Sequence, residues 1–300
     1  MIKFGTGGWR AIIGEEFTKE NIQKLALAMS LKIKAEHVED KPVVIGYDRR
    51  FLSKEAVIWS CEIFGQQGIK VLFVDRSSPT PLIMFYVMKH DLSYGMMVTA
   101  SHNPAIYNGI KVFTKGGRDA DEHQTADIER YLEQADKLYV PDLEENGQMP
   151  PHAYQELVKS GQVVEMNPMN EYLDNIISLI NLDAIRERDL RIAIDPMYGV
   201  SLTALCTILS IARCTVETIN AQHDTLFGGK MPAPTESTLR SLQNYVLDRY
   251  CDIGIATDGD ADRLGVIDDK GHYLHANTIL VMLYYYLLKY RGWRGPAVRN

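Results

Sequence analysis

The chain has 300 residues, of which 46% are hydrophobic and 24% are charged, a composition typical of a soluble globular protein. Glycine (22) and proline (12) are near their average frequencies, which excludes the collagen-like and low-complexity classes. The 32 lysine and arginine residues against 39 aspartate and glutamate residues give a net charge of −7. This balance argues against a broad nucleic-acid-binding surface, but it allows a local basic pocket for a small anion.

Cysteine spacing and the N-terminal sequence bear on the cellular compartment. The four cysteines include no Cys-x-x-Cys pair, so neither a zinc site nor a disulfide framework is expected. Scattered free cysteines are typical of a reducing compartment. The N-terminus shows no signal-peptide pattern, and the longest apolar stretch, 279–288, is only half a membrane span. We expect a cytoplasmic protein with neither a membrane nor a nucleic acid as its partner.

In the first half of the chain, short β-rich segments alternate with segments of helical periodicity. The apolar run at 43–47 predicts a buried strand. A helix is expected at 53–66, with Ser53 as its cap and Gly68 as its stop signal. Further strands are expected at 69–74, 95–99 and 110–113, and further helices at 81–90 and 121–137. This order is typical of an α/β layer fold with a largely parallel sheet.

The polar segment 141–151, which contains prolines and a glycine, is expected to be a boundary or linker. A second α/β series follows it. There we expect strands at 191–195, 214–219 and 253–256, helices at 170–180, 200–211 and 236–247, and a hairpin of 264–267 with 272–274. One further helix from Ala276 and a segment typical of a strand start at 296–300 would begin a third unit.

These patterns predict consecutive α/β domains with mostly parallel, mixed sheets. Domain I is expected at residues 1–150, domain II at 151–275 and the start of domain III at 276–300. The strands at 95–99 and 253–257 each run into a polar loop. Because the ligands of open α/β sheets bind outside the carboxyl ends of the strands, both loops are candidate sites.

The first candidate is the loop 99–104, with the sequence TASHNP. Pro104 keeps the preceding residue out of the helical region, so the loop has a fixed shape. Ser101 at a strand end would be exposed to a cleft, but serine is a poor nucleophile without an activating neighbour. His102 and Lys111 could assist it. The Gly-x-Ser-x-Gly elbow of α/β hydrolases is absent, and a turn without chemistry is the alternative interpretation.

The second candidate is the loop 257–263, with the sequence TDGDADR. Alternate residues of an extended loop project to one side, so Asp258, Asp260 and Asp262 would share one face and repel one another. A hard divalent cation relieves that repulsion, and three carboxylates leave open positions on Mg²⁺ for a phosphate oxygen. The loop lacks the glycine and glutamate that an EF-hand requires. An acidic surface turn is the alternative.

Four other segments carry weaker signals. The glycine-rich segment 4–10 can bring backbone N–H groups and Arg10 to an anion, although it matches neither a dinucleotide fingerprint nor a P-loop. For YDRR at 47–50 we favour a surface ion pair or a helix-start loop. We expect 227–236 to be a loop entering a helix. The tyrosines at 284–286 are expected to pack a helix rather than to stack on a ligand.

Taken together and in this order, the motifs resemble those of the α-D-phosphohexomutases, the phosphoglucomutase/phosphomannomutase family. The glycine-rich Arg motif, the TASHNP loop, the Asn-Gly-x-Lys segment and the Asp-Gly-Asp-x-Asp-Arg loop are matched at 4–10, 99–104, 108–111 and 258–263. Members of that family have four domains, and the resemblance covers two of them and the start of a third. The chain is therefore expected to be an N-terminal fragment, truncated before domains three and four.

The resemblance implies a role for each residue of the two central motifs. Ser101 resembles the serine that is phosphorylated in the resting enzyme. Asp258, Asp260 and Asp262 resemble the ligands of one Mg²⁺ per chain, with the phosphate on Ser101 completing the coordination. The metal site is thus expected to join two loops that are far apart in the sequence.

The resemblance also implies roles for basic residues. Lys111 and His102 resemble the candidates for proton transfer, and Lys111 is the preferred base, its pKa expected to be lowered by nearby Mg²⁺ and arginines. Arg10 and Arg263 resemble the arginines that line the phosphoserine site. Many members carry serine or aspartate where Gly7 stands, so the loop is expected to contact phosphate through its backbone alone.

The implied function is a mutase that interconverts sugar 1-phosphates and 6-phosphates through a phosphoserine and a sugar 1,6-bisphosphate, which also serves as activator. The fragment is expected to be inactive alone, because one wall of the cleft is missing. A metal-dependent sugar phosphatase and a non-catalytic phosphosugar-binding module are the alternatives. The sequence leaves the identity of the sugar and the oligomeric state open.

Overall fold

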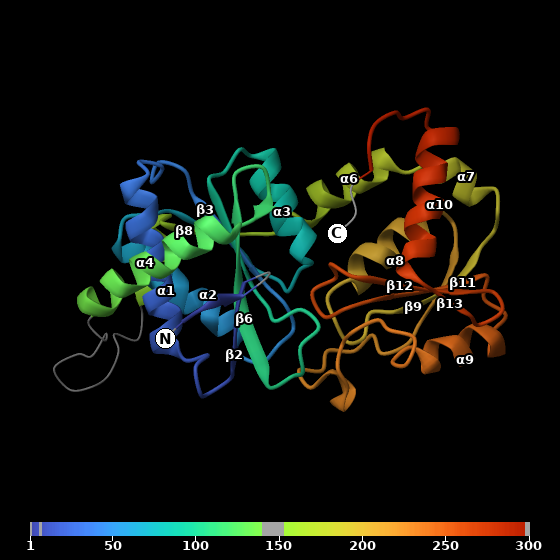
Figure 1. Cartoon of the computed structure of the whole chain (residues 1–300), viewed down its shortest axis with the longest axis horizontal. Coiled ribbons are helices and arrows are strands. Elements are labelled where there is room, and N and C mark those ends of the chain that lie inside the picture. Colours follow the sequence, from blue (N-terminus) through green and yellow to red (C-terminus); the bar gives the residue numbers. More distant parts are fainter. Residues whose placement is uncertain (1, 6–7, 140–152, 298–300) are drawn as a thin grey trace.

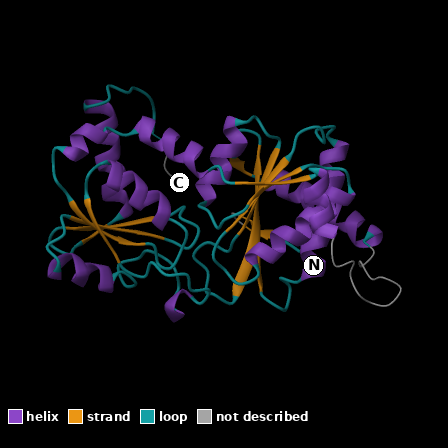
Figure 2. Ribbon diagram, turned by 180° about the vertical axis from the view of Figure 1, so that it is seen from behind, coloured by secondary structure: helices purple, strands orange, loops and turns teal. Residues whose placement is uncertain are grey.

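The computed structural model describes residues 2–5, 8–139 and 153–297, so the expected linker at 141–151 lies outside the described residues. The described chain forms two β-sheets with helices packed against them (Figure 1). From behind, the two sheets occupy separate halves of the molecule, and loops lie between them (Figure 2). The expectation of consecutive α/β units with mixed sheets is confirmed.

The first sheet has the strand order β1-β2-β6-β5-β3-β4-β8, with β7 paired to β6. Strands β5, β3, β4 and β8 pair in parallel, whereas β6 is antiparallel to β5, β2 and β7. The strands are β1 (Phe4–Gly5), β2 (Gly8–Ile12), β3 (Val43–Tyr47), β4 (Val71–Val74), β5 (Tyr94–Val98), β6 (Tyr107–Thr114), β7 (Arg118–Asp119) and β8 (Val163–Met166).

Helices cover both faces of this sheet. One large core cluster joins α1, α2, α4 and α5 to one face, and a smaller cluster joins α3 to the other. Strand β3 is buried over its first four residues, as expected for a strand covered on both faces. The helices are α1 (Lys19–Ala35), α2 (Ser53–Gln66), α3 (Thr80–Lys89), α4 (Glu122–Leu138) and α5 (Ala153–Ser160).

The second sheet has the order β10-β9-β11-β12-β13, parallel on the β10-β9-β11 side and antiparallel beyond β11. The expected hairpin is β12 with β13. The strands are β9 (Arg191–Asp195), β10 (Thr215–Thr218), β11 (Ile253–Thr257), β12 (Leu264–Asp268) and β13 (Tyr273–Leu274). The helices are α6 (Met169–Leu179), α7 (Leu182–Arg186), α8 (Leu202–Ile211), α9 (Arg240–Asp248) and α10 (Ala276–Lys289), with the 3₁₀ turn η1 at Phe227–Gly229.

Two details of the first half differ from the sequence-based expectations. The expected boundary at residue 150 is too early for the sheets, because β8 pairs in parallel with β4 and belongs to the first sheet. Ser53 does not cap α2: Leu52 occupies the N-cap with a φ of 62°, and the Ser53 hydroxyl donates to Asp48 instead. A buried acceptor thus competes with the helix terminus for this serine.

Helix α10, the last regular element of the described chain, has an apolar surface in contact with solvent. The expected packing of the tyrosines at 284–286 is wrong for this structure, since these side chains are 39–52% exposed. The rings of Tyr285 and Tyr286 contact that of Tyr290, the C-cap residue of α10. Among the described residues, no helix combines the length and apolarity that crossing a membrane requires.

Candidate active site

The two candidate loops face each other across the space between the sheets. Ser101 follows β5 and Asp258 follows β11, and the Ser101 hydroxyl donates to Asp258 Oδ2 at 2.7 Å although 157 residues separate them. Ser101 is only 1% exposed. The loops approach closely because Gly259 has no side chain: a Cβ there would lie 3.0 Å from the Ser101 carbonyl oxygen. The loops at the carboxyl ends of one strand from each sheet therefore form one site.

The Ser101 loop is held in an unusual backbone conformation. Ser101 has a φ of 49°, in the left-handed region that non-glycine residues rarely adopt. Its N–H donates to Thr99 Oγ1 at 2.8 Å, and the Asn103 N–H donates to the Ala100 carbonyl oxygen at 3.0 Å. Such backbone strain persists where surrounding contacts over-determine the conformation, and it gathers at functional sites.

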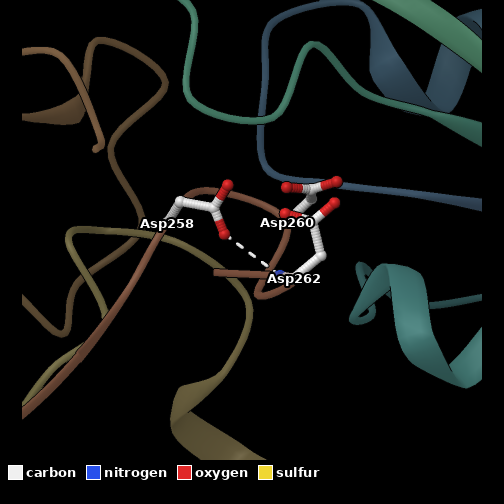
Figure 3. Close-up of side chains that lie close together, drawn as sticks. All are labelled: Asp258, Asp260 and Asp262. Atoms are coloured by element: carbon white, nitrogen blue, oxygen red, sulfur yellow. Dashed lines mark hydrogen bonds between the residues drawn. The ribbon is translucent and has the colours of Figure 1, made fainter. Parts of the chain in front are cut away.

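The three aspartates of the second loop form one cluster. A carboxylate oxygen of each lies within 4.8 Å of one from each of the others. Asp260 and Asp262 lie next to each other, and Asp258 faces them across the turn while it accepts a hydrogen bond from the Asp262 N–H at 3.0 Å (Figure 3). Ala261, with a φ of 60°, bends the turn between them.

The burial and the donor atoms of the cluster fit a divalent cation. Asp258 and Asp260 are fully buried, and buried carboxylates are costly unless they are paired or bind a metal. Asp260 Oδ1 has no hydrogen-bond partner in the described part of the molecule. A buried anionic oxygen without a donor is the ligand that a hard cation such as Mg²⁺ accepts, and the donors are all carboxylate oxygens.

The aspartates differ in their electrostatic environments. Burial, followed by the charges of Asp260 and Asp262, raises the pKa of Asp258 to about 8. Burial also opposes the ionised form of Asp260, but Lys111 and the Thr80 hydroxyl outweigh it and lower the pKa of that carboxyl. Asp260 is therefore the ionised member of the pair, and Asp258 takes up the proton in the absence of a cation.

Lys111 reaches the aspartate cluster from β6. Its ammonium group donates to Asp260 Oδ2 at 2.8 Å and to Asp262 Oδ2 at 2.6 Å, and the side chain is buried. Burial lowers the pKa of Lys111, but the two carboxylates outweigh that effect and raise it. The expected lowering depends on a bound Mg²⁺ as well as on arginines, and the two carboxylates by themselves act in the opposite direction.

The remaining basic candidates surround the Ser101 loop. His102 Nδ1 lies 3.4 Å from Ser101 Oγ, and burial, assisted by Arg263 and Arg10, lowers the pKa of the imidazole. Arg10 on β2 donates to Asn103 Oδ1 at 2.8 Å. The Arg263 side chain is exposed beside this loop, and its N–H donates to Asp258 Oδ1. The expected backbone contact at Gly7 lies outside the described residues.

Sequence reasoning missed one residue of the site and misplaced two. Thr80 at the start of α3 donates its hydroxyl to Asp260 Oδ2 at 2.6 Å and its N–H to the Asp260 carbonyl oxygen. The surface ion pair favoured for 47–50 is wrong, since the Asp48 and Arg50 side chains are fully buried. The available signal for Asp48 and Arg50 was a run of three charged residues, 48–50, directly after an apolar strand. No such signal marked Thr80, because a threonine at a helix start is common.

Comparison with known proteins gives concordant results. Models of phosphoglucomutase/phosphomannomutase alpha/beta/alpha domains I and II match residues 1–139 and 170–271. A probable phosphoglucosamine mutase of Pyrococcus abyssi is 32% identical, covering 98% of this chain and 59% of its own. A phosphoglucomutase/phosphomannomutase of Thermococcus kodakarensis is 28% identical, with coverages of 96% and 60%. A family member from Burkholderia thailandensis shares the fold, with a TM-score of 0.78 at 21% identity over 95% of this chain and 58% of that one.

The fold and the site define a class of protein in which two α/β domains bring a serine loop against a triple-aspartate loop. The chain belongs to the phosphoglucomutase/phosphomannomutase family, the α-D-phosphohexomutases, as its four motifs indicated. It spans about three fifths of the length of the curated relatives it matches.

Proposed function

We propose that this chain is the part of a Mg²⁺-dependent phosphohexomutase that holds the phosphorylated serine and the metal. The observation that carries the proposal is the 2.7 Å hydrogen bond from the Ser101 hydroxyl to Asp258, which sets a strand-end nucleophile against the aspartate cluster. Phosphoryl transfer needs positioning and charge neutralisation more than covalent activation. The names of the relatives, phosphoglucosamine mutase and phosphoglucomutase/phosphomannomutase, support this reaction class.

In the proposed reaction, phospho-Ser101 donates its phosphoryl group to a hydroxyl of a sugar monophosphate. The bond between phosphorus and Ser101 Oγ breaks as a bond from phosphorus to the sugar oxygen forms. The sugar hydroxyl gives its proton to a base, and the released Ser101 oxygen takes up a proton, so that the serine hydroxyl is restored. The resulting sugar 1,6-bisphosphate turns over and returns its other phosphate to Ser101 by the reverse step. A 1-phosphate thus becomes a 6-phosphate without loss of phosphate.

Several residues of the site would together neutralise the negative charge of the phosphoryl group. Asp258, Asp260 and Asp262, with a phosphate oxygen on Ser101, would hold one Mg²⁺, which when bound supplies charge neutralisation at the phosphoryl group. Arg10 would offset the remaining negative charge of the phosphoryl group, since its hydrogen bond to Asn103 already holds it at the serine loop. Arg263 is assigned to the same task from the aspartate loop.

Lys111 and His102 are the proposed proton-transfer groups. Lys111 keeps its proton in the described arrangement, because Asp260 and Asp262 raise its pKa. It can take the sugar proton only when those carboxylates are engaged elsewhere. The lowered pKa of His102 leaves its ring neutral at pH 7, so it can accept a proton near Ser101. Removing each side chain in turn and comparing the pH profiles of transfer separates the two roles.

Two alternatives predict different products. A metal-dependent sugar phosphatase shares the aspartates and a phosphorylated intermediate, and a non-catalytic module binds phosphosugars without transfer. The test is to incubate the chain with Mg²⁺ and glucose 1,6-bisphosphate, and to measure both its intact mass and the release of inorganic phosphate. We expect one phosphoryl group on the Ser101 peptide and little free phosphate. Stoichiometric phosphate release would favour the phosphatase, and an unmodified chain with bound sugar would favour the binding module.

Full mutase turnover is proposed for the longer protein of this type, because the relatives extend well beyond the matched region. We expect the 300-residue chain alone to have little or no mutase activity, since later domains would supply the other wall of the cleft. A coupled assay that shows full activity for this chain would contradict that expectation. A sugar phosphate in the cytoplasm is the proposed substrate.

The affinity for Mg²⁺ is expected to rise with pH. Because the pKa of Asp258 is raised to about 8, this carboxyl is protonated at pH 7 and must release its proton when a cation binds. We expect the association constant to increase about tenfold per pH unit between pH 6 and 7 and to level off above pH 8. Calorimetry in buffers of different ionisation enthalpy measures the proton released. An affinity that does not change over this range would contradict the assignment.

The same group makes the metal-free protein less stable at higher pH. A carboxyl whose folded pKa lies above its ordinary value of 3.8 contributes stability at low pH, and that contribution is lost as pH rises toward about 8. Mg²⁺ should therefore raise the unfolding temperature more at pH 8 than at pH 6.

A further inference from the structure

A buried arginine lies directly behind the Ser101 loop. The Arg50 guanidinium donates to four carbonyl oxygens, those of Ser101 at 2.6 Å, Asn103 at 2.7 Å, and Pro104 and Tyr107 at 2.9 Å each. These carbonyl groups point inward and need donors. Only a planar guanidinium offers enough N–H groups in a fixed fork to serve all four at once, and a lysine ammonium does not.

Arg50 is itself held by a buried carboxylate. Its Nε lies 3.2 Å from Asp48 Oδ2 in an ion pair that is closed to solvent. The same carboxylate accepts hydrogen bonds from the Thr99 hydroxyl at 2.6 Å and from the Ser53 hydroxyl at 2.9 Å. The Thr99 hydroxyl in turn accepts from the Ser101 N–H. Asp48 thus fixes Arg50 and one end of the Ser101 loop together.

The same turn also contacts the second half of the molecule. The Phe227 ring of η1 stacks on Arg50, with its centroid 4.8 Å from the guanidinium carbon. The neighbouring Arg49 donates through Nη1 to the carbonyl oxygens of Tyr198 and Ala221 at 3.2 Å each. One short turn after β3 therefore binds the serine loop on one side and the aspartate-bearing unit on the other.

We infer that Arg50 is a positioning residue for Ser101: it holds the serine loop in its left-handed turn through four carbonyl groups, and the stack on Phe227 sets that loop against the aspartate-bearing unit. The inference deepens the proposed function and rests on it only for the consequence in phosphoryl transfer. The geometric part, the ordering of the loop, holds with or without phosphate and metal.

The test compares Arg50→Ala with the control Arg130→Ala, which removes an exposed arginine that donates to Asp127 and lies over the Tyr131 ring. Amide hydrogen exchange of the segment 99–104 reports loop order, and the rate at which glucose 1,6-bisphosphate and Mg²⁺ phosphorylate Ser101 reports position. Guanidinium and methylammonium ions at equal low concentration are then added to the Arg50→Ala protein.

We expect exchange in 99–104 to be at least about tenfold faster in Arg50→Ala, because several hydrogen bonds to a charged donor are lost. Exchange in α4, where Arg130 lies, should not change. Phosphorylation of Ser101 should slow by about tenfold or more and recover with guanidinium but not with methylammonium. Rescue by guanidinium but not by methylammonium distinguishes a positioning role of Arg50 from a general loss of stability.

Arg50→Ala leaves Asp48 as an unpaired buried charge, so its folding is checked before the comparison. If it does not fold, the double variant Asp48→Asn/Arg50→Met replaces it. Phe227→Leu tests the contribution of the Phe227 stack alone. Unchanged exchange in 99–104 in the folded variant, or equal rescue by both cations, would overturn the inference. Faster exchange in a protein whose Ser101 is never phosphorylated would instead leave the positioning role standing and refute the proposed function.

Discussion

Ser101→Ala is expected to abolish phosphoryl capture by this chain and mutase turnover in the longer protein. The Ser101 hydroxyl is the group that meets the aspartate cluster, with its oxygen 2.7 Å from Asp258 Oδ2. Alanine removes that oxygen without adding volume. The intact mass after incubation with glucose 1,6-bisphosphate and Mg²⁺ should be that of the untreated protein. In the longer protein, loss of a covalent intermediate should lower kcat by at least about a thousandfold.

The matched control is Ser160→Ala, which removes an exposed hydroxyl at the end of α5, far from the site in the sequence. That variant should take up one phosphoryl group like the unchanged chain. The unfolding temperature of Ser101→Ala should stay close to that of the parent or fall slightly, because alanine keeps the same positive φ while the buried Asp258 carboxyl loses the hydroxyl that donates to it. If Ser101→Ala were phosphorylated at the normal rate, another side chain would be the acceptor and the phosphoserine proposal would be wrong.

The regular elements could be predicted where one physical signal was strong. The strands β3 and β9 begin and end where expected, because each is an apolar run bounded by polar residues. The expected helix at 121–137 begins one residue later, since Asp121 is its N-cap and forms a capping box with Gln124. The helix expected at 236–247 begins only at Arg240, because Thr235 and Thr238 form a hydrogen-bonded turn first.

Elements that depend on tertiary pairing were not predicted. Strand β8 lies beyond the polar segment, so the sequence placed it with the second unit, but its pairing with β4 extends the first sheet. Helix α1 was not predicted although Thr18 caps its N-terminus, because charged residues interrupt the apolar positions with which it buries Ile22 and Leu25 against the first sheet. Pairing across long sequence separations leaves little trace in local composition.

The proximity of the two motif loops could be predicted from the sequence, whereas their electrostatics could not. Ser101 and the aspartates were candidates because short polar loops follow buried strands, and the structure brings these strand ends together. The direction of the Lys111 pKa depends on which charges lie nearest, and that is a property of packing. Asp48 and Arg50 read as a surface pair because sequence does not reveal that four carbonyl groups lie behind the turn.

Asp260→Asn is expected to reduce the affinity for Mg²⁺ by at least about a hundredfold, more than the loss of a group that only supports a ligand. The change keeps the shape of the side chain but removes the charge of the cluster aspartate whose buried Oδ1 has no hydrogen-bond partner among the described residues. An amide oxygen can still accept from Thr80. Calorimetric titration with Mg²⁺ measures the effect, and Asp269→Asn, an exposed carboxyl at the β12–β13 turn, is the control that should bind normally.

The same variant also tests the cause of the raised pKa of Asp258. The charge of Asp260 helps to raise the pKa of Asp258 to about 8, so its removal should lower that pKa, and any residual Mg²⁺ binding should level off at lower pH than in the parent. Lys111 keeps Asp262 as a partner, so its charge remains paired. Unchanged Mg²⁺ affinity in Asp260→Asn would remove this loop as the metal site. A weakened site with the original pH dependence would show instead that burial alone, without the neighbouring charge, holds the proton on Asp258.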